Sequence, residues 1–501
     1  MIHKIFTATP NGYQASLVEI ETDVTLNSLP ATVIVGLPDT VVQESRERVR
    51  AAIRNTSFQY PVARVSINLA PGGLPKVGSH FDLATALSIL LAAGLIEFEP
   101  SGKMFIGELA LDGRLRSSAC VLSMVMAAKQ AKLKEVFVPM TNVQEAALVS
   151  GILVFGVTSL QEIIEHLQGR AKLTPIRRKN LVHTSSQEFG VDFAEIAGQE
   201  LAKRALLIAA AGFHNLRMTG SPGSGKTMLA KALAGILPEL TESEIVETTN
   251  IYSLAGKLTS GYVSVRPFRA PHHTASSISL IGGGARPGPG EVSLAHNGVL
   301  FMDELPEFPR HVLEVLRQPL EERSVTIARA YNTIKFPAKF ILVTAQNPCH
   351  CGNHGDPILV CRCHPGEVIK YNKKISGPLL DRIDLHIVVP RLPYEEFKKI
   401  RPQASSKELR QIVISARAKQ IARFRGSKTN SEMTARDLKQ YCVLDTQTEN
   451  LLQRAANQYL LSGRSIHRLL KVARTIADLE DSELIRQEHL AESLQYRMIQ
   501  N

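Results

Sequence analysis

Eight residues near the middle of the chain combine the residue types that bind a nucleoside triphosphate. They are Gly220, Ser221, Pro222, Gly223, Ser224, Gly225, Lys226 and Thr227, and they fit the spacing GxxxxGK[ST]. In this motif the glycines let backbone N–H groups surround the phosphates, the lysine neutralises phosphate charge, and the hydroxyl ligates Mg²⁺. The motif therefore predicts an ATP and Mg²⁺ site that extends to Met228, with a chance glycine-rich turn as the alternative.

The elements around this loop match what the motif requires. The apolar run 215–219 predicts a strand that leads into the loop, and Met228–Leu237 predicts a helix that leaves it. In this context the first helical N–H groups point toward bound phosphate. The predicted strand, loop and helix favour a nucleotide site over the chance turn.

A pair of acidic residues further along the chain supplies the second half of a hydrolytic site. Asp303 and Glu304 follow Val299–Met302, an apolar run that is typical of a buried strand. We expect Asp303 to hold Mg²⁺ and Glu304 to polarise the attacking water as general base. A helix cap is the alternative for such a pair, but two such motifs in one chain favour ATP hydrolysis.

Three further residues fit the pattern of an AAA+ ATPase. Asn347 follows the apolar run 341–346, as in sensor 1, where it would orient the water. Arg382, in SGPLLDRIDL, resembles an arginine finger that reaches the γ-phosphate in a neighbouring subunit. Arg468, in SIHRLL, resembles sensor 2 and would act on its own subunit's nucleotide. Each arginine has a solvated or ion-paired surface residue as its alternative.

Four of the six cysteines fall in the short segment CHCGNHGDPILVCRC, at Cys349, Cys351, Cys361 and Cys363. Two CxC pairs separated by a turn-rich stretch could place four thiolates around a structural Zn²⁺. A neighbouring histidine (His350, His354 or His364) could replace one thiolate. Unliganded surface thiols are the alternative, and in a reducing compartment a disulfide pair is the poorer interpretation.

The composition limits the class of protein. A net charge of +11 favours an anionic partner besides ATP, although a moderately basic enzyme without one remains an alternative. The N-terminus shows no signal-peptide pattern. The longest apolar stretch, Leu83–Ile96, is shorter than the roughly twenty residues that span a bilayer. We therefore expect a cytoplasmic protein without a membrane partner.

Breaks in the residue pattern predict an α/β protein of three parts. Residues 1–168 alternate strands and helices, 169–191 form a polar basic linker, 192–392 form the nucleotide domain, and 393–501 are helical. In the first part we expect strands at Gln14–Glu21, Thr32–Val35, Ala63–Asn68 and Glu135–Val138, and helices at Asp39–Asn55, Asp82–Ala93 and Leu122–Ala131.

Five longer motifs point to a specific protein family. They are GSPGSGKT, RPFRAPHHTASSISLIGGG, PGEVSLAHNGVLFMDELPEF, TAQNPCHCG and SGPLLDRIDLH. Together they resemble the YifB/ComM family of magnesium-chelatase-like AAA+ proteins over essentially the whole chain. The resemblance implies an N-terminal Lon-protease-like (S5-type) α/β domain, an AAA+ domain and a C-terminal helical lid. It also implies a homo-hexameric DNA motor that drives branch migration while single-stranded DNA is integrated during natural transformation.

The N-terminal part is similar to a Lon-like fold but lacks the residues of a peptidase. The nucleophile would fall near Gly78 and its lysine partner near Met124, and neither position carries the required side chain. A serine without a positioned base is a weak nucleophile. We therefore expect a scaffold or DNA-binding platform, and only Ser79 beside Lys76 keeps peptidase activity as an alternative.

The DNA contacts are expected on a β-hairpin between Val325 and Phe336, because hairpins before sensor 1 enter the pore in related motors. Arg329, Tyr331 and Lys335 would then meet single-stranded or branched DNA through charge and stacking. A solvated surface hairpin is the alternative. The segment 256–289, which includes Arg266 and Arg269, could form a second pore element.

A protein-remodelling ATPase of the chelatase type remains the second function class. By the same resemblance, magnesium-chelatase motor subunits share much of the AAA+ core but lack a Lon-like domain fused in front of it. The basic charge and the predicted hairpin favour the DNA motor. The sequence leaves open the structure of the DNA substrate, the polarity of movement and the conditions for hexamer formation.

Overall fold

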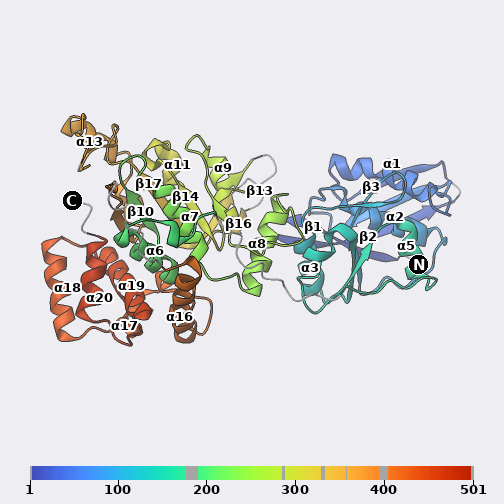
Figure 1. Cartoon of the computed structure of the whole chain (residues 1–501). Coiled ribbons are helices and arrows are strands. Elements are labelled where there is room, and N and C mark those ends of the chain that lie inside the picture. Colours follow the sequence, from blue (N-terminus) through green and yellow to red (C-terminus); the bar gives the residue numbers. More distant parts are fainter. Residues whose placement is uncertain are drawn as a thin grey trace. The chain divides into compact units, whose positions relative to one another are not determined.

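The computed structural model describes residues 3–26, 28–176, 190–284, 288–328, 333–356, 358–393 and 404–497. The chain divides into two compact units, each built from three stretches of sequence (Figure 1). Unit 1 comprises Met1–Val182, Thr241–Ser264 and Ala328–Phe336, and unit 2 comprises His183–Leu240, Val265–Ile327 and Pro337–Asn501. The later two stretches of unit 1 lie within the sequence predicted as the nucleotide domain, so the units alternate along the chain.

Unit 1 contains a seven-stranded mixed sheet with the order β3-β4-β2-β1-β5-β8-β9. Strands β1 and β2 form an antiparallel hairpin, whereas β5, β8 and β9 run parallel. The strands are β1 Lys4–Asn11, β2 Gln14–Thr25, β3 Ala31–Val35, β4 Arg64–Ala70, β5 Lys103–Phe105, β8 Glu135–Pro139 and β9 Leu153–Val157, with a small pair β6 Glu108–Leu109 and β7 Leu115–Arg116.

The helices of unit 1 are α1 Thr40–Arg54, α2 Asp82–Ala92, α3 Val121–Gln130, α4 Val143–Ala146, α5 Leu160–Leu167 and α8 Glu242–Leu254. The strands and helices predicted in this part are confirmed, with shifts at their ends. Helix α1 begins after Asp39 because the Asp39 side chain caps it. This side chain accepts a hydrogen bond from the Val42 N–H (2.8 Å). Its buried residues Val42, Val49 and Ile53 then recur at helical spacing.

Helix α8 comes from the sequence between the P-loop helix and the next strand, yet it packs within unit 1. Its Ser253 hydroxyl donates to the buried carboxylate of Glu145 (2.9 Å), and the Asn250 amide donates to the Tyr13 carbonyl (2.9 Å). Burial raises the pKa of Glu145 against the hydrogen bonds from Asn142 and Ser253. These contacts, distant in sequence, explain why helix α8 was not assigned to unit 1 from the sequence.

Unit 2 is built on a five-stranded parallel sheet with the order β11-β14-β17-β10-β18. Its strands are β10 Leu216–Thr219, β11 Phe268–Arg269, β14 Val299–Met302, β17 Ile341–Gln346 and β18 Leu385–Val388. Helices near the sheet are α6 Glu200–Gly212, α7 Lys226–Ile236, α9 Ser277–Ile281, α10 Glu291–Leu294, α11 Arg310–Glu314, α12 Arg317–Glu322, α13 Pro365–Asn372 and α14 Gly377–Leu380. The short pair β12 Gly282–Gly283 with β13 Gly288–Pro289 also lies in unit 2. Strand β15 Ser324–Ala328 pairs with β16 Thr333–Pro337 in a separate two-stranded sheet, and most of β16 is assigned to unit 1.

Both faces of this sheet are buried at its β14 strand, and for this reason β14 is apolar throughout. Val299 and Phe301 of β14 pack into a core with α6 and α7, whereas Leu300 and Met302 pack into a second core with α11. Successive strand residues point to opposite faces, so an uninterrupted apolar run is required. The buried strands predicted at 215–219, 299–302 and 341–346 are confirmed.

The C-terminal helices are α16 Ser406–Phe424, α17 Ala435–Tyr441, α18 Thr446–Gln458, α19 Gly463–Leu479 and α20 Gln487–Gln495 (orange to red in Figure 1). They share a core of their own, but Val413 of α16 and Ile476 of α19 also enter the core on α6 and α7. The helical part is therefore packed on the parallel sheet's helices within unit 2.

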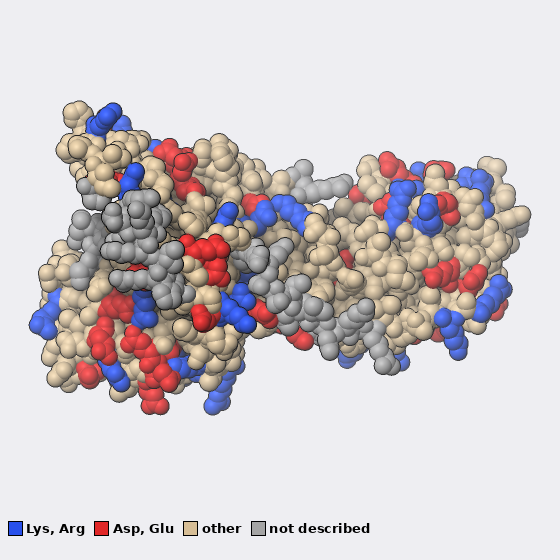
Figure 2. Space-filling model, in the orientation of Figure 1, with Lys and Arg blue, Asp and Glu red and all other residues tan. Residues whose placement is uncertain are grey.

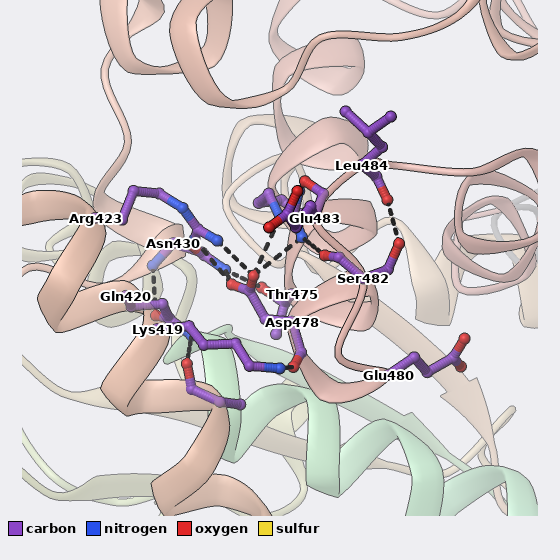
Figure 3. A network of polar contacts seen from close by, with 12 residues as sticks. Lys419, Gln420, Arg423, Asn430, Thr475, Asp478, Glu480, Ser482, Glu483 and Leu484 are labelled. Atoms are coloured by element: carbon purple, nitrogen blue, oxygen red, sulfur yellow. Dashed lines mark hydrogen bonds and ion pairs between the residues drawn. The ribbon is translucent and has the colours of Figure 1, made fainter.

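One buried carboxylate links three helical segments of this part (Figure 3). Asp478 is 1% exposed and accepts hydrogen bonds from Arg423 (2.8 Å), Asn430 (2.8 Å) and Arg474 (3.2 Å). The second guanidinium, that of Arg474, is itself 2% exposed. Two cations and one amide thus converge on a single anion that has little access to water.

We expect Asp478→Ala to destabilise the helical part strongly, because removing the anion leaves two guanidinium groups near each other in the interior. Breaking a buried ion pair by removing one partner costs about 3–5 kcal/mol. Urea unfolding and hydrogen exchange of α16 and α19 amides would measure the change in stability. Asp481→Ala is the control, since the Asp481 side chain is 90% exposed and should matter little.

No helix in the described ranges is long and apolar enough to cross a membrane. On the face shown in Figure 2, the coloured Lys and Arg side chains are interspersed with Asp and Glu side chains. The net charge of +11 is therefore not gathered into one continuous patch among the described residues of that face.

Candidate functional site

The predicted phosphate loop lies between β10 and α7, as the motif requires. Strand β10 ends at Thr219 and helix α7 begins at Lys226. Gly223 and Gly225 have φ angles of 77° and 91°, in the left-handed region that favours glycine. Gly220 cannot carry a side chain, because a Cβ there would lie 2.1 Å from the Val389 carbonyl oxygen. The shape of the loop thus requires glycine at these three positions.

The Lys226 ammonium lies over this loop. It donates to the carbonyls of Gly220 (2.7 Å) and Ser221 (2.9 Å). Burial lowers the pKa of Lys226, and the charge of Asp303 opposes that shift. A phosphate would be a stronger acceptor than these carbonyls, because its oxygens are charged.

The acidic strand end meets the loop in space. Asp303 directly follows β14, and its Oδ2 accepts a hydrogen bond from the Thr227 hydroxyl (3.1 Å). Strand β17 separates β14 from β10, so this contact depends on the order of strands in the sheet. A hydroxyl and a carboxylate at this distance are oxygen ligands of the kind that Mg²⁺ takes beside phosphates.

Asn347 completes a row of polar residues at the carboxyl ends of the strands. It directly follows β17, and its Oδ1 lies 3.4 Å from the Lys226 Nζ. The residues predicted for ATP binding and hydrolysis from β10, β14 and β17 therefore converge on one edge of the sheet. This is the edge at which open parallel sheets bind their ligands.

Glu304 is positioned by a strained backbone and by a histidine. Its φ of 50° lies in the left-handed region, and its side chain is 55% exposed. The carboxylate lies 3.4 Å from Nδ1 of His273, a residue from the segment after β11. We predicted His273 only as part of a second pore element and not at the nucleotide site, although the adjacent histidines in RAPHHT follow an edge strand of the same sheet.

Arg382 and Arg468 lie near each other at the amino ends of the strands, opposite the P-loop. Both line a cavity of about 460 Å³ with Asn215, which precedes β10, and Asp384, which precedes β18. Arg468 pairs with Asp384 (3.3 Å), and Arg382 pairs with Glu321. Burial raises the pKa of Asp384, but His214 and Arg468 outweigh it and hold that pKa well below its usual value. The predicted position of Arg468 at its own subunit's nucleotide is not found, because α19 places it at the amino ends of the strands.

The cations that line this cavity outnumber its three carboxylates, Glu321, Asp384 and Glu432, so its net charge is positive. Arg323, Lys428 and Lys471 also line it, and the Arg382 Nε is buried without a hydrogen-bond partner among the described residues. An unpaired buried donor favours an acceptor that comes from outside the chain. The cavity has the chemistry of a site for an anion.

The four cysteines converge as predicted. The Sγ atoms of Cys349, Cys351 and Cys361 are 3.4 to 3.7 Å apart, and all four thiols lie within 4.8 Å of one another. Zn–S bonds of about 2.3 Å in a tetrahedron place sulfur atoms about 3.8 Å apart. The donor set therefore fits a four-thiolate metal site, and no predicted histidine substitution is needed.

The pKa values of these thiols move in opposite directions. Backbone N–H groups of Arg362 and Asn353 lower the pKa of Cys351 to about 6. At Cys361 the hydrogen bond from the Cys363 backbone is outweighed by desolvation and by Cys351 and Cys349, and the pKa rises to about 12. Neighbouring thiolates repel one another, so a bound cation would stabilise the fully deprotonated cluster.

Comparison with known proteins agrees with this geometry. Residues 192–397 match the family model described as magnesium chelatase, subunit ChlI, and 403–497 match its C-terminal model. Residues 20–142 match a model described as subunit ChlI of Mg-chelatase. Competence protein ComM of Haemophilus influenzae is 42% identical over 98% of this chain and 97% of its own length. The chain belongs to the ComM/YifB family.

Other similar proteins differ in how much of this chain they cover. The uncharacterized protein YifB of Escherichia coli is 39% identical over 99% of this chain and 97% of its own length. The magnesium-chelatase 38 kDa subunit of Rhodobacter capsulatus is 26% identical, over 31% of this chain and 50% of its own length. This ComM/YifB chain is thus similar to ComM over nearly its whole length and to the chelatase subunit over about a third of it.

The predicted hairpin of this ComM/YifB protein is present as β15 and β16. Lys335 lies on β16 and is exposed, whereas Arg329 and Tyr331 lie outside the described residues. Two of the arginines expected in a second pore element, Arg266 and Arg269, have partners within the chain, and their place in a pore stays a prediction. Arg269 forms a bidentate pair with Glu291 (2.6 and 2.8 Å), and Arg266 donates to backbone carbonyls such as that of Asn297 (2.7 Å).

The N-terminal unit of the ComM/YifB chain gives Lys76 and Ser79 separate partners. The Lys76 ammonium donates to the Pro71 carbonyl, and the Ser79 hydroxyl donates to Glu108. Burial lowers the pKa of Lys76. Because each side chain has another partner, this geometry does not form a serine–lysine pair.

Proposed function

We propose that this protein is an ATP-driven DNA motor that works as a homo-hexamer in the cytoplasm and moves branched DNA during the integration of single strands. The observation that carries the ATPase is the convergence of Lys226, Thr227, Asp303 and Asn347 at one sheet edge. Support for DNA comes from the full-length similarity to a competence protein and from the basic charge.

The positions of Arg382 and Arg468 support the proposal that the homo-hexamer is a ring. A four-residue strand rises about 3.3 Å per residue, so the two edges of the sheet are roughly 10–13 Å apart. Arg382 and Arg468 lie at the edge away from their own P-loop and line a cavity suited to an anion. We propose that both arginines act on the ATP of a neighbouring subunit, in a ring where each site is completed in trans.

ATP hydrolysis measured with and without single-stranded DNA, together with strand rearrangement of a labelled four-strand junction, tests this function. We expect DNA to stimulate hydrolysis and ATP to drive junction migration. A chelatase-type remodelling ATPase is the second candidate, supported by the partial similarity to the chelatase subunit. ATP hydrolysis by a protein that neither binds DNA nor responds to it would favour that second function.

The hairpin residue Lys335 provides a specific test of DNA contact. Lys335→Ala should leave basal ATP hydrolysis nearly unchanged, because Lys335 lies on β16 and is not among the residues at the P-loop edge. DNA affinity should fall, and the slope of log affinity against log salt should drop by roughly one for each phosphate that the lysine neutralises. Lys129→Ala, an exposed lysine at the end of α3, is the matched control. Equal salt slopes for both variants would remove Lys335 from the DNA path.

We also propose that the four cysteines hold one structural Zn²⁺ per chain. Protein purified without a polyhistidine tag should contain about one equivalent of zinc, as expected for a single four-thiolate site. Cys361→Ser should release most of that metal because it removes one ligand. Cys442→Ser is the control, since Cys442 is buried in the core of the C-terminal helices. Metal-free wild-type protein would contradict the proposal.

A further inference from the structure

The cysteine-rich segment, of which residues 349–356 and 358–363 are described, contacts the phosphate loop directly. The Ser221 hydroxyl donates to Oδ2 of Asp356 (2.6 Å). Gly352 lies so close to Pro222 that a Cβ at Gly352 would be 2.5 Å from the proline ring, and its φ of 79° also favours glycine. Two consecutive residues of the phosphate loop therefore contact the cysteine-rich segment.

Asp356 also has partners within the cysteine-rich segment and at Arg391. Its Oδ1 accepts from the backbone N–H groups of Ile358 (2.9 Å) and Leu359 (3.0 Å), and Arg391 lies 3.3 Å from Oδ2. The side chain has no exposed surface. Ser221 first, and then these N–H groups, lower the pKa of Asp356 to about 2. The carboxylate is thus a fixed anion that joins the segment to the P-loop.

A second connection runs through the chain itself. Asn347 contacts the Lys226 ammonium, and two residues later Cys349 is fully buried in the thiol cluster. The cluster therefore lies next to both the sensor residue and the phosphate loop. A change in the positions of the thiols would therefore alter the nucleotide site through two sets of contacts. One is the contact of the segment with Ser221 and Pro222, and the other is the chain from Cys349 to Asn347.

The segment has little apolar burial to hold its fold. Ile358, Leu359 and Val360 are 60%, 41% and 84% exposed. A loop that buries so little apolar surface needs another source of stability, and metal binding is folding free energy in such small motifs. Four converging thiols supply the ligands for it.

We propose that the metal-bound cysteine segment is a clasp on the phosphate loop, so that metal occupancy sets the affinity for ATP. The metal would hold the segment in shape, and Asp356 and Gly352 would hold Ser221 and Pro222 in the shape that receives phosphate. This inference rests on the proposed ATPase function and adds to it a metal control of nucleotide binding.

The test is the binding of a fluorescent ATP analogue, without DNA, to zinc-loaded and chelator-treated protein whose metal content is measured. We expect metal removal to weaken binding by roughly tenfold or more, the scale of removing a hydrogen bond to a charged group. Amides of the P-loop should also exchange faster with deuterium. Asp481→Ala serves as a control for the removal of a carboxylate.

Asp356→Ala separates the clasp from the metal site. This variant keeps all four cysteines, so it should retain its zinc, yet it should bind the analogue as weakly as metal-free wild type. Removing its zinc should then weaken binding little further. Lys226→Ala gives the lower limit of affinity.

Three outcomes would overturn the clasp. They are wild-type affinity in metal-free protein, wild-type affinity in zinc-loaded Asp356→Ala, or an absence of metal from wild type. Wild type that binds no analogue in either state would instead overturn the proposed ATPase function, and the clasp with it.

Discussion

Arg382→Ala should bind ATP normally and hydrolyse it roughly 10³–10⁵-fold more slowly, the range attributed to arginine fingers. The residue lies at the amino ends of the strands, away from its own phosphate loop, so ATP affinity in the same subunit should not depend on it. Nucleotide titration and steady-state hydrolysis would separate binding from turnover. Arg310→Ala, an exposed arginine at the start of α11, is the matched control.

Mixing experiments decide whether the arginine acts between subunits. Arg382→Ala protein supplies intact P-loops, and Lys226→Ala protein supplies intact arginines. Mixed rings should therefore contain some complete sites, and their activity should exceed the sum of the two parents. Native mass spectrometry would confirm co-assembly. Co-assembled rings with only the summed activity would contradict the action of Arg382 in trans.

Glu304→Gln should bind ATP but turn it over roughly 10²–10⁴-fold more slowly, the usual contribution of a general base. The amide keeps the size of the side chain and removes only its basic function. Asp303, which contacts Thr227, and Lys226 remain in place, so metal and phosphate binding should persist. Single-turnover hydrolysis and nucleotide titration on the same preparation would measure both quantities.

Glu307→Gln is the matched control, because Glu307 is a nearby carboxylate whose partner is Lys374 (3.5 Å) and not a residue of the P-loop. It should hydrolyse ATP at nearly the wild-type rate. Normal turnover by Glu304→Gln would remove Glu304 from the role of base. His273, the neighbour of Glu304, would then become the residue to test next.

Much of the nucleotide site was predictable because its signals are local. The glycines, Lys226 and Thr227 are adjacent in sequence, and a strand–loop–helix pattern positions them. Asp303 and Asn347 follow apolar runs that end at the same sheet edge, since parallel strands present their carboxyl ends together. The cysteine cluster was predictable for the same reason, because two short CxC pairs flank one turn.

By itself, the sequence determined which residues could bind phosphate, activate water and hold a metal, because residue type and short spacing carry that chemistry. Only the tertiary structure decided that Arg468 joins Arg382 away from its own P-loop, that α8 belongs to unit 1, and that Asp356 holds Ser221. These three facts depend on strand order and on packing between residues far apart in the chain. Spacing along a sequence carries no information on such contacts, since they are formed by burial and hydrogen bonding after the local elements exist.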